Sequence, residues 1–249
     1  MYKYIISLTT IPSKFDYLYL AMDSMVKQTV VADVIIINIP KTYDFRLTGE
    51  ISQEKINDFL GKYSKYNVVI NMVEKDDGPG TKILGLLKNN ILDKDKINED
   101  TYLILLDDDF VYKPYLIEYF DKNINVNKDI DVATYYSYNY NNINVAQAAD
   151  AMIFKYNIIN NFLDYYEIIK DEDYLFYHDD FFISYFFYLK NKNIQYIPPP
   201  YGSLIYDWHE FSKIDSLFHL EGKYNRNNLN MKSSEILNNL KNNNKFICI

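Results

Sequence analysis

Three consecutive aspartates, Asp107, Asp108 and Asp109, follow the wholly apolar stretch Tyr102–Leu106. A short apolar run of this kind predicts a strand that is buried on both faces. In open α/β sheets, ligands bind just beyond the carboxyl ends of the strands. If the backbone stays extended there, Asp107 and Asp109 point to one side and Asp108 to the other.

Two carboxylates that face one point repel each other, and a divalent cation removes that repulsion. Mg²⁺ is commonly held by one or two carboxylates together with the phosphates of a substrate. The pattern therefore predicts that Asp107 and Asp109 hold Mg²⁺ or Mn²⁺. The alternative is a turn that caps a helix near Pro114, since Asp is common in turns and caps. One aspartate would be enough for that purpose, so three in a row favour the metal site.

A second candidate site is the segment Asp77-Gly78-Pro79-Gly80-Thr81-Lys82, which lies between a predicted strand and a predicted helix. Glycines let a ligand approach the backbone, and free N–H groups at a helix start attract anions. Lys82 adds a positive charge, but Ile83 follows it, so the segment is not a P-loop. The alternative is a simple turn and helix cap.

The third candidate is His178-Asp179-Asp180, at the start of an aromatic-rich helix. Asp at a helix N-terminus is stabilising for dipole and capping reasons alone. The functional interpretation is a general base, which must lie within hydrogen-bond reach of the hydroxyl that it deprotonates. The residues leave open whether Asp179 or Asp180 has this role.

His209 and His219 are weaker candidates. Either imidazole is able to complete a metal shell, and Mn²⁺ accepts a His ligand more readily than Mg²⁺ does. Hydrogen-bonded surface or core histidines are the more common case. Trp208, the single tryptophan, is interpreted as a packing residue.

Composition excludes several classes of protein. The chain has 249 residues and a net charge of −8, which argues against general electrostatic binding of nucleic acid. Cys248 is the only cysteine, so a disulfide framework and a Cys-based zinc site are excluded. Residues 1–10 lack the pattern of a signal peptide, and no apolar run reaches transmembrane length. We therefore expect a cytoplasmic protein with no transmembrane segment.

Strand-like and helix-like segments alternate along the first half of the chain. Strands are predicted at residues 3–8, 34–39, 67–73 and 102–106, and helices at 16–28, 50–63 and 81–90. After Asp109 we expect helices at 114–123, 156–169 and 181–190, and strands at 131–136, 144–148, 151–154 and 194–197. The Asn- and Lys-rich segment 238–245 is expected to be loosely held. This order predicts an α/β fold: one domain with a mixed, mostly parallel sheet flanked by helices.

Taken together and in this order, the motifs resemble those of nucleotide-sugar glycosyltransferases with the GT-A (Rossmann-like) fold, close to family 2. The motifs are Ser7-Leu8-Thr9-Thr10-Ile11-Pro12, Asp77 to Lys82, the Asp triplet and Asp179-Asp180, and the resemblance covers roughly residues 3–200. It implies a metal-dependent enzyme that moves a sugar from a nucleotide-diphosphate sugar, with UDP favoured, to a hydroxyl of a glycan, lipid-linked or protein-linked acceptor.

The resemblance also implies roles for individual residues. Asp107 and Asp109 match the Asp-x-Asp metal motif, and Asp180 or Asp179 matches the catalytic base of inverting members. The donor-binding positions that it implies are Thr9, Thr10, Pro12, Asp77, Gly78, Thr81, Lys82 and Asp108. Residues 1–112 would form the nucleotide-sugar half, 113–230 the acceptor half and 231–249 a C-terminal tail. The family often has glycines before its acceptor helix, whereas residues 146–150 contain none.

Two other functions remain open at this point. A sugar nucleotidyltransferase would usually have a glycine-rich basic loop after the first strand, but residues 7–14 contain no glycine and one lysine. A catalytically silent nucleotide- or carbohydrate-binding module predicts binding without turnover.

Overall fold

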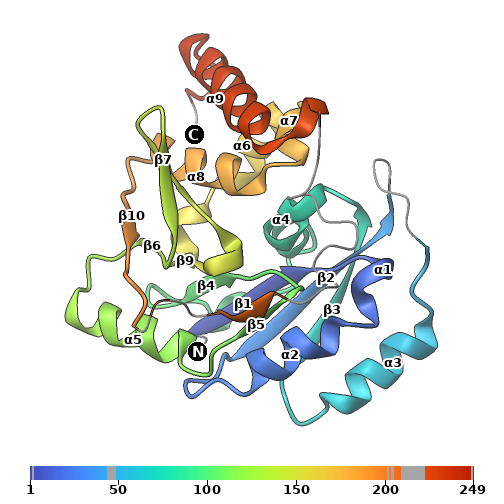
Figure 1. The fold of residues 1–249 in the computed structure, drawn as a ribbon. Coiled ribbons are helices and arrows are strands. Elements are labelled where there is room, and N and C mark those ends of the chain that lie inside the picture. The colour runs from blue at the N-terminus through green and yellow to red at the C-terminus, as the bar shows by residue number, and fades with distance from the viewer. Residues whose placement is uncertain (2, 44–48, 201, 203–204, 209–221, 248) are drawn as a thin grey trace.

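A seven-stranded sheet forms the centre of the molecule, in a computed structural model of residues 1–249 (Figure 1). The structure describes the chain except for residues 2, 44–48, 201, 203–204, 209–221 and 248. Of residues 205–208 and 222, it describes only the backbone. The strand order is β10-β6-β9-β4-β1-β2-β3. Two further pairs of strands, β11 with β5 and β7 with β8, are antiparallel.

The first half of the chain builds the parallel part of the sheet. Its strands are β1 (Tyr4–Thr9), β2 (Val34–Thr42), β3 (Val68–Lys75) and β4 (Tyr102–Leu105). Each connection contains a helix, namely α2 (Leu18–Val26), α3 (Gln53–Lys62) and α4 (Thr81–Lys88). β4 is buried along its whole length because helices cover both faces of the sheet, which explains its uniformly apolar sequence.

The second half adds shorter elements and the one antiparallel strand of the large sheet, β9 (Met152–Lys155). The other strands are β5 (Phe110–Tyr112), β6 (Val132–Thr134), β7 (Ser137–Tyr140), β8 (Ile143–Ala146), β10 (Ile194–Tyr196) and β11 (Ile205–Trp208). The other α-helices are α1 (Pro12–Phe15), α5 (Leu116–Val126), α6 (Phe162–Ile169), α7 (Asp173–Phe176), α8 (Asp179–Leu189) and α9 (Arg226–Asn242).

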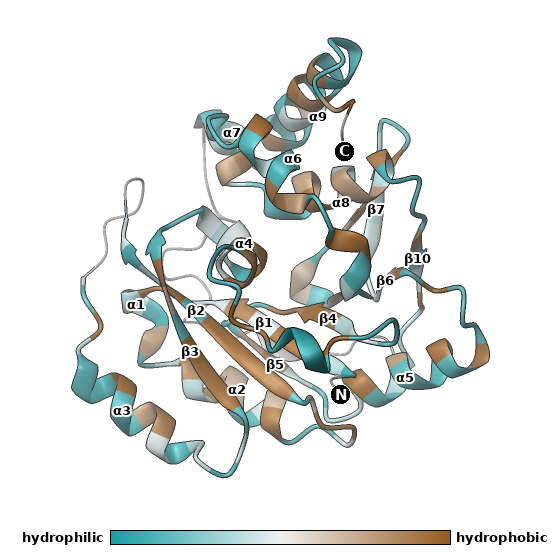
Figure 2. Ribbon diagram, turned by 180° about the vertical axis from the view of Figure 1, so that it is seen from behind, coloured by the Kyte–Doolittle hydropathy of each residue, from teal (hydrophilic) through white to brown (hydrophobic). Residues whose placement is uncertain are grey.

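Helices cover the sheet in two layers with separate apolar cores. One core joins the sheet to α2, α3 and α5, and the other joins it to α4, α6 and α8 (Figure 1). α9 lies on the outer side of this second layer. Figure 2 shows hydrophobic central strands and hydrophilic outer helix surfaces, as expected for a sheet buried between helices. Among the described residues, no helix is long and apolar enough to cross a membrane.

The predicted α/β architecture is confirmed: the sheet is mixed and mostly parallel, is flanked by helices and forms one domain. The chain does not stay extended through the Asp triplet, which was the condition for Asp107 and Asp109 to point to one side. β4 ends at Leu105, and Asp108 and Asp109 form a turn that leads into β5. The three carboxylates therefore follow the turn and not the alternation of a strand.

The expectation of a loosely held segment at residues 238–245 is wrong for its first part. α9 continues to Asn242, and Leu237 is completely buried against the second core. Its cap residue Asn225 accepts a hydrogen bond from the Asn228 N–H at 3.0 Å, which starts the helix. α9 thus spans residue 230, the predicted boundary between the acceptor half and the tail.

Candidate functional site

The carboxyl ends of β1, β3 and β4 lie at one edge of the sheet because these strands are parallel. β9 runs the opposite way, and its first residue, Met152, pairs with Leu105 at the end of β4. The turn before β9 therefore reaches the same edge as the Asp triplet. The ends of β1, β3 and β4 and the turn before β9, which are distant in sequence, therefore lie at one edge of the sheet.

Lys82 is at the centre of this meeting point. Its Nζ lies 2.6 Å from Asp107 Oδ1 and 3.1 Å from Asp179 Oδ2, and its side chain is only 4% exposed. Burial by itself lowers the pKa of the Lys82 ammonium, but the charges of Asp107, Asp179 and Asp180 outweigh burial and raise it above its ordinary value. Lys82 therefore stays charged and joins the Asp triplet to the start of α8.

A buried polar network fixes the backbone of α4 at Lys82. Ser7 Oγ in β1 donates a hydrogen bond to the Lys82 carbonyl, and Asn38 Nδ2 in β2 donates to Ser7 Oγ at 2.9 Å. Asn71 Nδ2 in β3 donates to Asn38 Oδ1 at 2.8 Å and to the Gly85 carbonyl at 3.0 Å. Three neighbouring strands thus hold the helix that carries the central cation.

Lys14, in α1, is the ion-pair partner of the other two members of the Asp triplet. Its Nζ donates a hydrogen bond to Asp109 Oδ2 at 2.8 Å and lies 3.8 Å from Asp108 Oδ1. Burial and the neighbouring Asp108 raise the pKa of the Asp109 carboxyl to about 7, even though Lys14 opposes the shift. This part of the site is therefore rich in negative charge.

Asp179 and Asp180 open α8 but have different partners. Asp180 Oδ1 accepts a hydrogen bond from the Ala148 N–H at 3.0 Å, and Asp180 Oδ2 lies 3.6 Å from a guanidinium nitrogen of Arg226. Burial and the charge of Asp179 raise the pKa of the Asp180 carboxyl to about 7. Within the described part of the chain, buried Asp179 Oδ2 accepts no hydrogen bond and has only the ion pair with Lys82.

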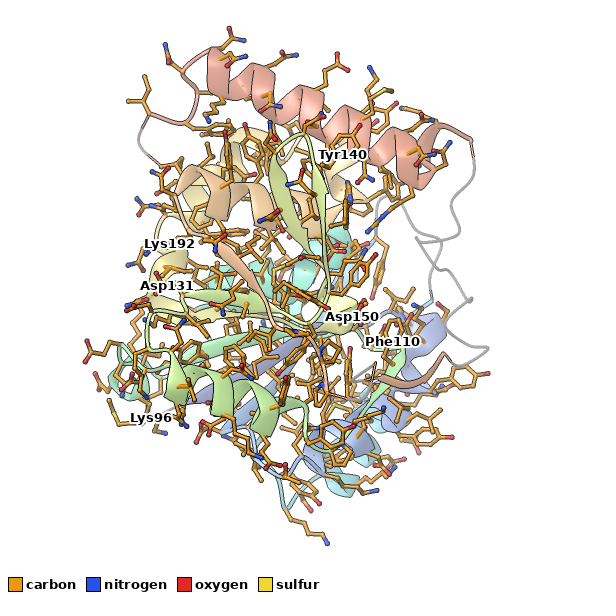
Figure 3. All side chains as sticks on the ribbon, turned by 60° about the vertical axis from the view of Figure 1, so that its left-hand side comes forward. Lys96, Phe110, Asp131, Tyr140, Asp150 and Lys192 are labelled. Carbon is orange, nitrogen blue, oxygen red and sulfur yellow. The ribbon has the colours of Figure 1, made fainter. Side chains whose placement is uncertain are left out.

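Asp150 adds a further carboxylate from the short 3-10 helix Ala148–Asp150. Burial and the charge of Asp107 raise the pKa of the Asp150 carboxyl to about 6. Figure 3 labels Asp150, which lies between the sheet and the upper helices. The next residue, Ala151, has a φ of +66°, an uncommon conformation for a residue with a Cβ atom.

Carboxylates outnumber cations among the described side chains of this site. The carboxylates belong to Asp107, Asp108, Asp109, Asp150, Asp179 and Asp180, and the cations to Lys14, Lys82 and Arg226. An anionic substrate needs additional positive charge to enter such a site, and a divalent cation supplies it.

The residues fit a divalent cation that is shared with a substrate. The described residues contain no group of three or more His, Cys, Asp or Glu side chains placed to hold a metal ion by themselves. Mg²⁺, however, needs only one or two carboxylates when substrate phosphates complete its shell. Among the described contacts, the ion pairs with Lys82 and Lys14 use one oxygen each of Asp107, whose side chain is 30% exposed, and Asp109.

The turn before α4 is stabilised by its own side chains. The Gly78 N–H donates to Asp76 Oδ1 at 3.0 Å, and the Asp77 N–H donates to Thr81 Oγ1 at 2.9 Å. The Asp77 carboxylate pairs with Lys88 and accepts a hydrogen bond from the Tyr166 hydroxyl at 2.9 Å. Of the predicted residues in this segment, only Lys82 contacts the Asp triplet.

Among the described contacts, the predicted residues at and just after the end of β1 make no hydrogen bond or ion pair with the carboxylates. Thr9 Oγ1 donates a hydrogen bond to the Asn38 carbonyl at 2.9 Å, and Pro12 begins α1. Thr10 is buried, and its Oγ1 has no hydrogen-bond partner within the described residues. His209 and His219 lie outside the residues that the structure describes, and only the backbone of Trp208 is described, at the end of β11.

Sequence reasoning missed three residues of the site: Lys14, Asp150 and Arg226. Lys14 is the only lysine in the loop and helix start after β1, which is a signal in retrospect. Arg226 is one of two arginines in a chain with 24 lysines, so its residue type is itself unusual. Asp150 carried no signal beyond its position ahead of a predicted strand.

Comparison with known proteins supports the fold and does not identify a family. No family model matches the chain, and no curated protein matches it in sequence. The crystal structure of S. aureus TarS 1–349 has a TM-score of 0.51 at 17% identity, over 80% of this chain and 58% of that one. A second crystal structure of S. aureus TarS has a TM-score of 0.53 at 16% identity, over 84% of this chain and 37% of that one.

A Francisella tularensis 2-C-methyl-D-erythritol 4-phosphate cytidylyltransferase gives a TM-score of 0.45 at 11% identity, over 82% of this chain and 93% of that one. That score is too low to support a common fold. The chain is thus similar in fold to TarS, of which it spans well under two thirds.

Proposed function

We propose that the protein is a nucleotide-sugar glycosyltransferase of the family 2 type, which transfers a sugar from a nucleotide-diphosphate sugar to an acceptor hydroxyl with inversion. The observation that carries the proposal is the position of Lys82. One buried ammonium contacts both Asp107, at the end of β4, and Asp179, at the start of α8. A charge that is buried between two functional motifs suits the departure of a diphosphate beside a proton acceptor.

We assign donor binding to residues 1–112, with UDP as the favoured nucleotide. Asp107 and Asp109 would hold Mn²⁺ or Mg²⁺ against the diphosphate, and when bound this ion would neutralise phosphate charge. Lys82 and Lys14 supply the positive charge of the chain itself at the same place. Thr9, Thr10, Pro12, Asp77, Gly78, Thr81 and Asp108 remain proposed donor-binding residues.

We assign the role of general base to Asp180. Asp179 is engaged by Lys82, which needs that carboxylate to balance its buried charge. Asp180 keeps one oxygen that accepts no short hydrogen bond, and its pKa of about 7 is suited to proton transfer at neutral pH. Asp180 takes the proton of the acceptor hydroxyl, the oxygen attacks the anomeric carbon, and the bond to the diphosphate breaks with its electron pair on the phosphate oxygen.

We assign acceptor binding to residues 113–230 and expect a glycan, lipid-linked or protein-linked acceptor. The absence of glycine at 146–150 is compatible with this assignment because the 3-10 helix Ala148–Asp150 still brings the Ala148 N–H to Asp180. The strained Ala151 backbone stands directly after this turn. Strain of this kind is often found at functional sites.

The experiment is to incubate the protein with a panel of sugar nucleotides and Mn²⁺ and to measure released nucleoside diphosphate, with and without candidate acceptors. Asp107→Asn and Asp109→Asn should abolish metal-dependent donor binding. Asp180→Asn should keep donor binding and lose transfer. Transfer at the normal rate by Asp180→Asn would refute the base assignment.

The same experiment separates the two other functions. Release of pyrophosphate from a nucleoside triphosphate and a sugar phosphate would identify a nucleotidyltransferase. Binding of a sugar nucleotide with no turnover under any condition would identify a silent binding module. Either result would overturn the transferase proposal.

A further inference from the structure

Arg226 occupies a position in α9 that is unfavourable for the helix itself. It is the first residue of the helix, whose first turn contains no acidic residue. The N-terminus of a helix dipole is positive, so a cation there is destabilising. An arginine at this place, in a chain that otherwise uses lysine for nearly all its cations, needs a compensating partner elsewhere.

The partner is Asp180. A guanidinium nitrogen of Arg226 lies 3.6 Å from Asp180 Oδ2, and the Arg226 side chain is 31% exposed. The guanidinium carbon also lies 6.0 Å from the centre of the Tyr138 ring, on β7. Arginine presents a planar, permanently charged group that is able to face a carboxylate and an aromatic ring together, which lysine is not.

A second set of contacts holds α9 against the start of α8. The imidazole of buried His178 lies 3.2 Å from Ser233 Oγ through Nδ1 and 3.3 Å from the Tyr138 hydroxyl through Nε2. The Tyr138 hydroxyl donates a hydrogen bond to Asn230 Oδ1 at 2.8 Å. Because His178 directly precedes the two aspartates, these contacts set the distance between Arg226 and Asp180.

We propose that Arg226 is a positioning residue for the transfer reaction, which keeps the buried Asp180 carboxylate ionised and holds Oδ2 in place to accept the proton of the acceptor. The proposal rests on the proposed function. Asp180 Oδ1 is already occupied by the Ala148 N–H, so Oδ2 is the oxygen left for the acceptor. A separation of 3.6 Å is too long for a good hydrogen bond, so Arg226 acts by charge and leaves Oδ2 available.

The other groups that act on the charge of Asp180 come from four elements. They are Asp179 on α8, Lys82 on α4, Asp107 after β4 and Tyr138 on β7. Burial and Asp179 raise the pKa of the Asp180 carboxyl, whereas Arg226 and Lys82 lower it. Lys82 forms ion pairs with Asp107 and Asp179. Among the described ion pairs, Arg226 is the cation that pairs with Asp180 and with no other carboxylate.

The test compares Arg226→Gln, Arg226→Lys and the control Lys223→Gln. Lys223 is an exposed cation three residues before Arg226, and it faces Tyr174, Tyr224 and Asp173. In Arg226→Gln the acid limb of the kcat/KM profile should move up by about one pH unit, at the low end of the range for an opposite charge 4–6 Å away. Arg226→Lys should give a smaller shift, and Lys223→Gln should give none.

A ¹³C-carboxyl NMR titration of aspartate-labelled protein reads the same change without turnover, with Asp180→Asn to assign the signal. A raised Asp180 pKa in Arg226→Gln supports the electrostatic role of Arg226 even if no sugar transfer is ever found, a result that would refute the proposed function and with it the role of Arg226 in transfer. An unchanged Asp180 pKa and an unchanged acid limb in folded Arg226→Gln overturn it. If Arg226→Gln does not fold, Arg226→Lys decides by the same two measurements.

Discussion

Replacing Lys82 with methionine tests the centre of the site. Methionine keeps the length and most of the apolar surface of the side chain and removes only the charge. Asp107 and Asp179 then lose an ion-pair partner that lay 2.6 Å and 3.1 Å away. Removing one partner of a buried ion pair costs about 3–5 kcal/mol because the other charge is left uncompensated.

The expected cost for Lys82→Met lies at the lower end, about 3 kcal/mol, because Asp107 is partly exposed and regains water. For a chain of this size, that corresponds to a fall of about 6–12 °C in Tm. Lys55→Met is the matched control. Lys55 makes an ion pair of nearly equal length, 2.7 Å, with Asp16, but both side chains are more than half exposed. It should cost less than about 1 kcal/mol.

The pKa of Lys82 is raised in the folded state, so its stabilising effect is fully present below its unfolded pKa and does not change between pH 5 and 8.

Urea unfolding of both variants and the wild type at pH 5, 6.5 and 8 measures these free energies. The assay needs no substrate and no metal, so it is independent of the proposed function. A cost for Lys82→Met no larger than that of Lys55→Met would refute the buried ion-pair arrangement.

Three further perturbations follow from the same structure. Because the pKa of Asp180 is about 7 and a base acts when deprotonated, kcat/KM should fall below pH 7. Asp180→Asn should lower transfer at least about 100-fold in a steady-state assay. Gly78→Ala should cost about 2–3 kcal/mol in urea unfolding, since Gly78 has a φ of +64° and an added Cβ would lie 2.3 Å from the Phe176 carbonyl oxygen. The control Gly61→Ala should stabilise the protein slightly, because a Cβ at Gly61 in α3 meets open space. Asn38→Ala should cost about 2–3 kcal/mol in the same assay because it leaves buried polar partners on β1, β3 and α4 without their hydrogen bonds.

The fold was accessible from the sequence because its signals are local. A run such as Tyr102–Leu106 is apolar at every position, and only a strand covered on both faces requires that. Alternation of such runs with helical periodicity defines a parallel sheet and its active edge. The short strands β5 and β7 were not predicted.

The ion pairs of the site were not accessible in this way. Sequence motifs located Lys82 and most of the acidic residues, but Lys14 and Arg226 come from elements without a motif. Lys14 meets Asp109 across 95 positions of the chain, and Arg226 meets Asp180 from α9, a helix that the sequence analysis did not predict. Such long-range contacts depend on how the helices pack, which local patterns do not encode.

Asp77 and Asp107 show how the partner of a carboxylate decides what its contact connects. Both follow the carboxyl end of a parallel strand, and both have a lysine partner in α4 or at its end. Asp77 pairs with Lys88 and is also fixed by the Tyr166 hydroxyl, so its contacts tie α4 to α6. Asp107 pairs with Lys82, which is shared with the start of α8, so its contact joins the two halves of the chain. The partner of a carboxylate, and not its place in a motif, therefore determines which elements of the fold its contact connects.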